Sequence, residues 1–226
     1  MKIFTYIKYF FFLGFNWNWK IAFHILSHEI SGEKKYGINT TGSDELKKIK
    51  AEGVDISHAT MYMPANYLLL EEVFAKLPEA HRDHFVDIGC GMGRVLCVAA
   101  HHGFSKVTGI DFSKEFCARA DQNLAATKEK FPALEFSVIN KDATITNIPA
   151  DADCIFFFNP FDQFVMNKVT TNILKSYEKN PRDIFIIYLN PLYKTEFLHI
   201  GFKEIFHTVR MKYMEAVILQ KEAQAG

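Results

Sequence analysis

Apolar stretches alternate with helix-like segments along most of this 226-residue chain. The stretch at residues 154–158, Cys-Ile-Phe-Phe-Phe, has no polar alternation, as expected of a central strand that is covered on both faces. Elsewhere apolar residues recur at helical spacing, for example at Val165, Val169 and Ile173. This alternation predicts a doubly wound α/β sheet. Buried parallel strands are expected at residues 85–88, 107–110, 134–140, 154–158 and 183–189.

The end of the chain predicts a different strand arrangement. Residues 202–208 and 213–220 are extended runs joined by a short turn around Arg210, which is typical of an antiparallel hairpin at a sheet edge. With the five parallel strands they complete a seven-strand sheet whose last strand is antiparallel. At 226 residues and 49% hydrophobic content, the chain can bury a substantial core within one such domain.

A glycine-rich turn follows the first predicted strand. Gly89, Gly91 and Gly93 alternate through it, so the backbone can adopt positive φ and approach a ligand without interference from a Cβ atom. Asp87 precedes this turn, and Asp111 lies at the tip of the next strand. A carboxylate about 20 residues beyond a glycine loop is placed to accept hydrogen bonds from two ribose hydroxyls. The pattern predicts a site for a nucleotide-type cofactor.

The glycine spacing distinguishes between cofactors. A dinucleotide loop requires Gly-x-Gly-x-x-Gly, whereas this chain has Asp-x-Gly-x-Gly-x-Gly, and Arg94 occupies the position of the last glycine. The run from Asp87 to Gly93 resembles the first motif of the class I methyltransferases that depend on S-adenosylmethionine (SAM). The resemblance extends in order over residues 62–222. It implies that SAM is the cofactor and that the chain is a methyltransferase.

The same resemblance assigns residues to the two ends of the cofactor. The glycine loop surrounds the methionine end, and Asp111 holds the ribose. Phe112 lies along the adenine, and Asp142 is the acidic residue near the adenine amine. The implied cofactor-binding residues are Asp87, Gly89, Cys90, Gly91, Gly93, Asp111, Phe112, Asp142, Ala143 and Asn159.

The acceptor side is suggested by the run Asn159-Pro160-Phe161 after the fourth strand. It resembles the Asn-Pro-Pro-aromatic motif of methyltransferases that act on planar amines, except that the second proline is missing and Asp162 follows. Asn-Pro also simply terminates a strand, because proline cannot donate to the hydrogen-bond ladder. The resemblance implies that Asn159, Pro160 and Phe161 are catalytic and that an amine of a protein or small molecule is methylated.

A second acceptor-side element is Tyr62-x-Pro64, which precedes a predicted helix. It resembles an element that borders the cofactor and acceptor pockets in some class I enzymes, and it adds Tyr62 to the implied catalytic residues. Tyr62 or Asp162 is the candidate to help remove a proton from the acceptor. The alternative is an ordinary helix start, with Pro64 in the first turn.

The first sixty residues are predicted to form an extension to the methyltransferase domain at 61–226. Residues 3–15 are apolar and aromatic, but Lys8 interrupts them and the stretch is too short to span a bilayer. It also lacks the small-residue cleavage site of a secretory signal. We expect residues 1–60 to act as a cap or lid over the acceptor pocket without holding the core together, or to contact a second subunit. Its aromatic residues and lysines leave peripheral membrane contact as the alternative.

Charge and residue usage restrict the partners. The 26 basic and 26 acidic side chains balance, which disfavours a nonspecific nucleic-acid binder. The four cysteines are expected to be reduced thiols in a cytoplasmic protein. His101 and His102 are adjacent and lack metal-ligand spacing, so we expect helix-end histidines and no metal.

Two other function classes stay open at this stage. One is a protein that binds SAM as a sensor without turnover. The other is a nicotinamide-dependent oxidoreductase, which Arg94 and the final hairpin disfavour.

Overall fold

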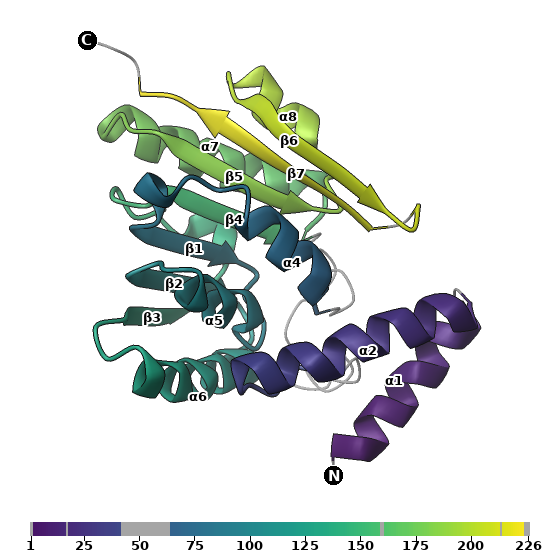
Figure 1. Ribbon diagram of the computed structural model, residues 1–226. Coiled ribbons are helices and arrows are strands. Elements are labelled where there is room, and N and C mark those ends of the chain that lie inside the picture. The colour runs from purple at the N-terminus through teal and green to yellow at the C-terminus, as the bar shows by residue number, and fades with distance from the viewer. Residues whose placement is uncertain (1, 17, 42–63, 159–160, 213, 224–226) are drawn as a thin grey trace.

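Within the residues that the structure describes, seven strands form one mixed sheet (Figure 1). The computed structural model describes residues 2–16, 18–41, 64–158, 161–212 and 214–223, and its strand order is β3-β2-β1-β4-β5-β7-β6. The first five strands are parallel, whereas β7 runs antiparallel to both β5 and β6. The strands are β1 (His84–Ile88), β2 (Lys106–Asp111), β3 (Glu135–Asn140), β4 (Cys154–Phe158), β5 (Ile184–Leu189), β6 (Lys203–Arg210) and β7 (Met214–Lys221).

Helices cover both faces of this sheet, as the doubly wound pattern predicts. Buried residues of α4 and α5 share one apolar cluster with one face of the sheet, and those of α7 and α8 share another with the opposite face. The predicted fold, an α/β sheet with an antiparallel last strand and an amino-terminal helical extension, is confirmed. The helices are α1 (Lys2–Asn16), α2 (Trp19–Tyr36), α4 (Tyr67–Phe74), α5 (Arg94–His101), α6 (Lys114–Lys130), α7 (Gln163–Lys179) and α8 (Lys194–His199), with 3-10 turns η1 (Glu79–His81) and η2 (Ala143–Ile145).

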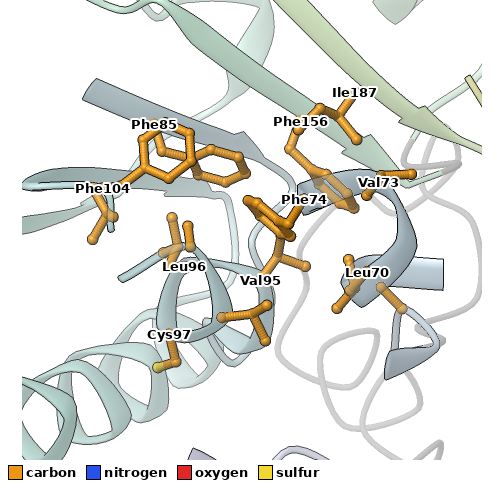
Figure 2. Packing of buried hydrophobic residues seen from close by; sticks show 14 of the residues in the cluster. Leu70, Val73, Phe74, Phe85, Val95, Leu96, Cys97, Phe104, Phe156 and Ile187 are labelled. Carbon is orange, nitrogen blue, oxygen red and sulfur yellow. The ribbon is translucent and has the colours of Figure 1, made fainter. Parts of the chain in front are cut away.

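The core beneath α4 and α5 is built around aromatic rings (Figure 2). The Phe74 ring of α4 packs near the rings of Phe85 and Phe104, with centroid separations of 5.5 and 6.1 Å. Phe85 in turn lies 6.2 Å from Phe156 of β4. Each of these rings is buried, and burial of one such side chain contributes about 1.5 to 3 kcal/mol. This packing fixes α4 and α5 against the strands whose ends carry the candidate site.

The opposite core confirms the helical spacing seen in the sequence. The predicted apolar stripe of α7 is buried against the sheet, and Phe197 of α8 joins it. The predicted hairpin is also confirmed, because β6 ends at Arg210 and a tight turn leads into β7. Met211 and Lys212 adopt positive φ in that turn, at 51° and 67°.

One expected helix start is wrong. Pro64 does not lie in the first turn of α4, because the helix begins at Tyr67 and Asn66 is its N-cap. The Asn66 side chain accepts a hydrogen bond from the Leu68 amide at 2.9 Å. Asparagine is a preferred N-cap because its side-chain oxygen satisfies an amide that the helix leaves unpaired.

The amino-terminal segment forms a helical hairpin of α1 and α2, with α1 projecting from the rest of the protein (Figure 1). Tyr36 at the end of α2 and Ile38 after it belong to the core beneath α4 and α5. These two residues are therefore part of the core, and the expectation that residues 1–60 do not hold the core together stays a prediction. The predicted boundary between residues 60 and 61 lies outside the described residues.

Candidate active site

The candidate site lies at the carboxyl ends of the central strands. β1 lies between β2 and β4 and is parallel to both, so the three carboxyl ends reach the same edge of the sheet. This edge carries Asp87 near the end of β1 and Asp111 at the end of β2. Ligands of open α/β sheets bind outside this edge.

The loop after β1 has the backbone conformation that its glycines predict. Gly89, Gly91 and Gly93 adopt φ values of 84°, 51° and 77°. The Gly89 and Cys90 amides donate to the Ile110 carbonyl at 2.8 and 3.1 Å, which ties the loop to the tip of β2. The left-handed region is costly for residues with a Cβ atom, so glycine is required by the turn itself.

Two of the glycines also permit close packing. A Cβ atom on Gly93 would lie 3.0 Å from the Ala120 Cβ of α6. A Cβ atom on Gly109 of β2 would lie 2.7 Å from the Cys90 sulfur. The loop therefore rests directly on β2, and the start of α5 rests directly on α6.

Asp111 is oriented by two backbone amides. Its Oδ2 accepts a hydrogen bond from the Gly91 amide and its Oδ1 accepts one from the Ser113 amide, both at 2.8 Å. Burial raises the pKa of Asp111 to about 6, although both backbone hydrogen bonds oppose the shift. A carboxylate has about four lone-pair sites, so each oxygen can accept a further hydrogen bond.

Asp87 and Cys90 are more deeply enclosed. Burial, with a smaller contribution from the Asp111 charge, raises the pKa of Asp87 well above its usual value. Burial also raises the pKa of the Cys90 thiol, so Cys90 packs as a small apolar residue and is not a nucleophile. A positive charge next to Asp87 would favour the ionised carboxylate.

The side predicted to hold the adenine contains one residue that the sequence analysis missed. The Asn140 side chain, at the end of β3, donates to the Phe112 carbonyl at 2.8 Å and to the Asp111 carbonyl at 3.1 Å. Phe112 is half-buried, whereas Asp142 is exposed and caps η2 through the Thr144 amide at 2.8 Å. Asn140 could have been identified from the strand register, which places it opposite Asp111. That register is known only once the pairing of β2 with β3 is known.

The predicted acceptor side is described only in part. Tyr62, Asn159 and Pro160 lie outside the described residues. Phe161 is partly buried and packs against the core beneath α7. Asp162 is the N-cap of α7, and its side chain accepts a hydrogen bond from the Val165 amide at 3.0 Å. This structural role was not expected of the residue proposed to help remove a proton from the acceptor.

Arg94 is the second residue whose role the sequence analysis missed. Its guanidinium donates to both carboxylate oxygens of Glu29 in α2, at 2.7 and 2.6 Å, and it stacks over the Tyr67 ring at 4.3 Å. It also donates to the Thr40 hydroxyl and the Ala65 carbonyl, each at 2.8 Å. The residue that follows the glycine loop therefore links the site to the amino-terminal hairpin.

The cysteines and His101 lie in packed, structural environments. All four cysteines are free and buried. His101 has its Nδ1 2.9 Å from the Cys97 carbonyl, so the interpretation as a helix-end histidine is confirmed for His101. Across the described part of the chain, no group of three or more histidine, cysteine or acidic side chains is gathered as a metal site would require.

Residues 85–179 match the family model described as a methyltransferase domain. No curated protein sequence matches the chain significantly.

Several solved structures with the same fold are described as methyltransferases or methylases. A SAM-dependent methyltransferase from Mesorhizobium loti is 13% identical, with a TM-score of 0.52, over 69% of this chain and 97% of its own. The ribosomal protein L11 methylase from Lactobacillus delbrueckii is 15% identical, with a TM-score of 0.50, over 69% and 78%. The yhhF protein from Escherichia coli, whose methyltransferase assignment is provisional, is 17% identical, with a TM-score of 0.51, over 72% and 92%. Residues 85–179 therefore match a methyltransferase domain model, and the chain has the Rossmann-like fold of these solved structures.

Proposed function

We propose that this chain, which has the fold of the class I methyltransferases, binds SAM at the carboxyl edge of its sheet and transfers the methyl group to an acceptor. The observation that carries the proposal is the Asp111 carboxylate, which the Gly91 and Ser113 amides orient beside three glycines with positive φ. Such a carboxylate at the tip of the second strand suits a ribose with two free hydroxyls.

The residues of this edge fit the cofactor chemically. Each Asp111 oxygen is engaged by one amide and can still accept a ribose hydroxyl. The positive charge that Asp87 needs for ionisation would come from the cationic methionine end, which the glycine loop is proposed to surround. The low exposure of both carboxylates strengthens these contacts because water competes less for them.

The chain itself would contribute mainly positioning. When bound, SAM supplies an activated methyl group on a cationic sulfur. The protein then aligns the acceptor with that methyl group and excludes water from the edge of the sheet. Phe161, next to α7, would form an apolar wall of the acceptor pocket.

An amine of a protein or small molecule is the acceptor that we propose. The support is the Asn159-Pro160-Phe161 run, because a carboxamide oxygen can accept a hydrogen from an amine and aim the nitrogen lone pair at the methyl group. The balance of 26 basic and 26 acidic side chains argues against a polynucleotide acceptor.

Calorimetric titration of the purified protein with SAM, its demethylated product and NAD tests the cofactor. We expect binding of the first two and none of NAD. Asp111→Ala should weaken SAM binding by about 1.5 to 3 kcal/mol, the range for lost hydrogen bonds to a charged group. Asp121→Ala, which removes an exposed carboxylate from α6, is the matched control and should bind SAM normally. Unchanged affinity of Asp111→Ala would contradict the ribose assignment.

The reaction requires a separate test. Methyl-labelled SAM is incubated with the protein and with fractions of protein and small-molecule amines. Transfer of label to an amine is expected. Binding of SAM without transfer to any fraction would favour the sensor, and label on oxygen or carbon would refute the amine acceptor.

A further inference from the structure

The helical hairpin of α1 and α2 exposes an unusual amount of apolar surface. Of the thirteen large hydrophobic side chains that the described residues leave exposed, seven lie on these two helices. Their exposed fractions range from 45% to 78%. We call this surface the hairpin face, and it consists of Phe4, Ile7, Phe11, Phe15, Trp19, Phe23 and Ile30.

The hairpin face follows from the spacing of apolar residues along each helix. Phe4, Ile7, Phe11 and Phe15 recur at intervals of three and four, so they form one stripe along α1. Tyr9 and Leu13 of α1 instead form a small buried cluster with Ala22 of α2. α1 is thus apolar on two sides, one of which packs on α2 while the stripe from Phe4 to Phe15 stays exposed among the described residues.

Aromatic contacts organise one end of the hairpin face. Trp19 lies 5.9 Å from the Phe11 ring and 5.3 Å from the Phe15 ring, both edge to face. A Cβ atom on Gly14 would lie 2.3 Å from the Trp19 ring, so the tryptophan packs directly over the α1 backbone. This end therefore presents a contiguous apolar surface of rings in contact.

The exposed charged residues on α1 and α2 have one sign. Lys8, Lys20 and Lys34 are exposed. The acidic residues of the two helices point inward: Glu29 pairs with Arg94, and Glu33 accepts hydrogen bonds from Tyr6 and from the Thr40 and Thr41 amides. Hydrogen bonds from these partners outweigh the effect of burial and lower the pKa of Glu33. Exposed charge on the described part of the hairpin is therefore cationic.

The hairpin does not have the dimensions of a membrane span. Among the described helices, none is both long enough and apolar enough to cross a bilayer. Helices with an aromatic face and a cationic border lie along the bilayer surface, where anionic lipids attract their lysines.

We propose that the hairpin face docks the protein on the surface of an anionic lipid bilayer. The aromatic side chains would enter the boundary between headgroups and acyl chains, and Lys20 would contact the headgroup phosphates. A second copy of the chain fits this face less well. A two-fold interface sets the same patch against itself, so it would bring the lysines of both copies together.

Tryptophan fluorescence gives a direct measurement, because the only two tryptophans of the chain are Trp17 and Trp19. The full-length protein is titrated with vesicles of phosphatidylcholine alone and of phosphatidylcholine with one quarter phosphatidylglycerol. A blue shift of the emission, and quenching by brominated acyl chains, are expected with the anionic vesicles. Binding should weaken as salt is added, because exposed charges are screened.

Variants separate the apolar and cationic contributions. The double variant Phe11→Ser and Phe15→Ser should lower the vesicle partition coefficient about tenfold or more, because two aromatic side chains no longer leave water. Lys20→Gln should lower it about fivefold on anionic vesicles only. Phe164→Ser, which removes an exposed phenylalanine from α7, is the matched control and should bind like the parent protein.

Three results would overturn the proposal. One is an absence of binding to anionic vesicles. Another is equal binding of the parent protein and the Phe11→Ser, Phe15→Ser variant. The third combines two observations: the parent protein is a dimer in sedimentation velocity whereas the variant is a monomer, and vesicles leave the parent emission unchanged. That result would assign the hairpin face to a second copy. Circular dichroism of each variant verifies that it remains folded.

Discussion

Arg94 and Glu29 form a buried two-pronged ion pair, with Nη1 to Oε1 at 2.7 Å and Nη2 to Oε2 at 2.6 Å, although they lie 65 positions apart. Arg94 begins α5 directly after the glycine loop, and Glu29 belongs to α2. Both side chains are at most 3% exposed. The stability of the amino-terminal hairpin and the geometry of the candidate site are therefore coupled.

Loss of either partner should be strongly destabilising. Glu29→Gln or Arg94→Met leaves one charge buried without its counterion, which typically costs about 3 to 5 kcal/mol. Chemical denaturation measures this change. Glu72→Gln, which weakens the surface pair with the exposed Arg210, is the control and should cost less than about 1 kcal/mol. A double variant, Glu29→Leu with Arg94→Met, should recover part of the loss. Single variants as stable as the parent would refute the coupling.

SAM affinity should depend on pH through Asp111. Because burial raises the pKa of this group to about 6 in the free protein, it is mostly ionised at pH 7.5 and mostly protonated at pH 5. In the proposed complex the ionised carboxylate accepts both ribose hydroxyls, so binding should lower this pKa and affinity should fall as pH drops through about 6. Calorimetry from pH 5 to 8 measures the change, and Asp111→Asn should bind weakly with a flat profile. A parent profile that is equally flat would contradict this assignment.

The same raised pKa affects stability with the opposite sign. Protonated Asp111 is favoured in the folded state over the unfolded state, where the usual value is 3.8. Its contribution to stability is therefore present below that value and is lost as pH rises through about 6. Bound SAM should offset this loss, so its stabilising effect on thermal unfolding should be larger at pH 8 than at pH 5.

Substitution of Gly93 should be more harmful than substitution of another glycine with positive φ. Gly93→Ala combines a left-handed conformation, which costs about 1 to 2 kcal/mol, with a contact of 3.0 Å to Ala120. Gly103→Ala has the same backbone cost at a φ of 93° but meets no atom within 4 Å. Thermal denaturation of both variants isolates the packing of α5 against α6. Equal losses of stability in the two variants would show that the contact between position 93 and Ala120 can relax at no cost.

Asn159→Ala should reduce methyl transfer by about 100-fold or more, the cost of a lost positioning contact, and should leave SAM affinity nearly unchanged. Steady-state turnover with labelled SAM and a titration of SAM measure the two quantities. Asn167→Ala, on the exposed side of α7, is a matched control. Normal turnover of the Asn159 variant would indicate that the Asn-Pro run only terminates the strand.

The sequence by itself determined the fold class and the backbone of the glycine loop. Strand positions follow from short buried runs such as residues 154–158, because a central parallel strand leaves no face for polar side chains. Positive φ at Gly89, Gly91 and Gly93 is allowed by local sterics, because glycine has no Cβ atom. Both inferences need only neighbouring residues, which is why they could be predicted.

Only the tertiary structure decided which distant groups meet. Asn140 donates to the carbonyls of Asp111 and Phe112 because β3 pairs with β2. Arg94 forms its ion pair with Glu29 because α2 packs against α5. Tyr36 proved to be part of the core, and the outward side of α1 proved to be apolar, although the local pattern was compatible with other arrangements. Periodicity shows that a helix has an apolar side. Which side is buried depends on the shape of the surface that the rest of the chain offers.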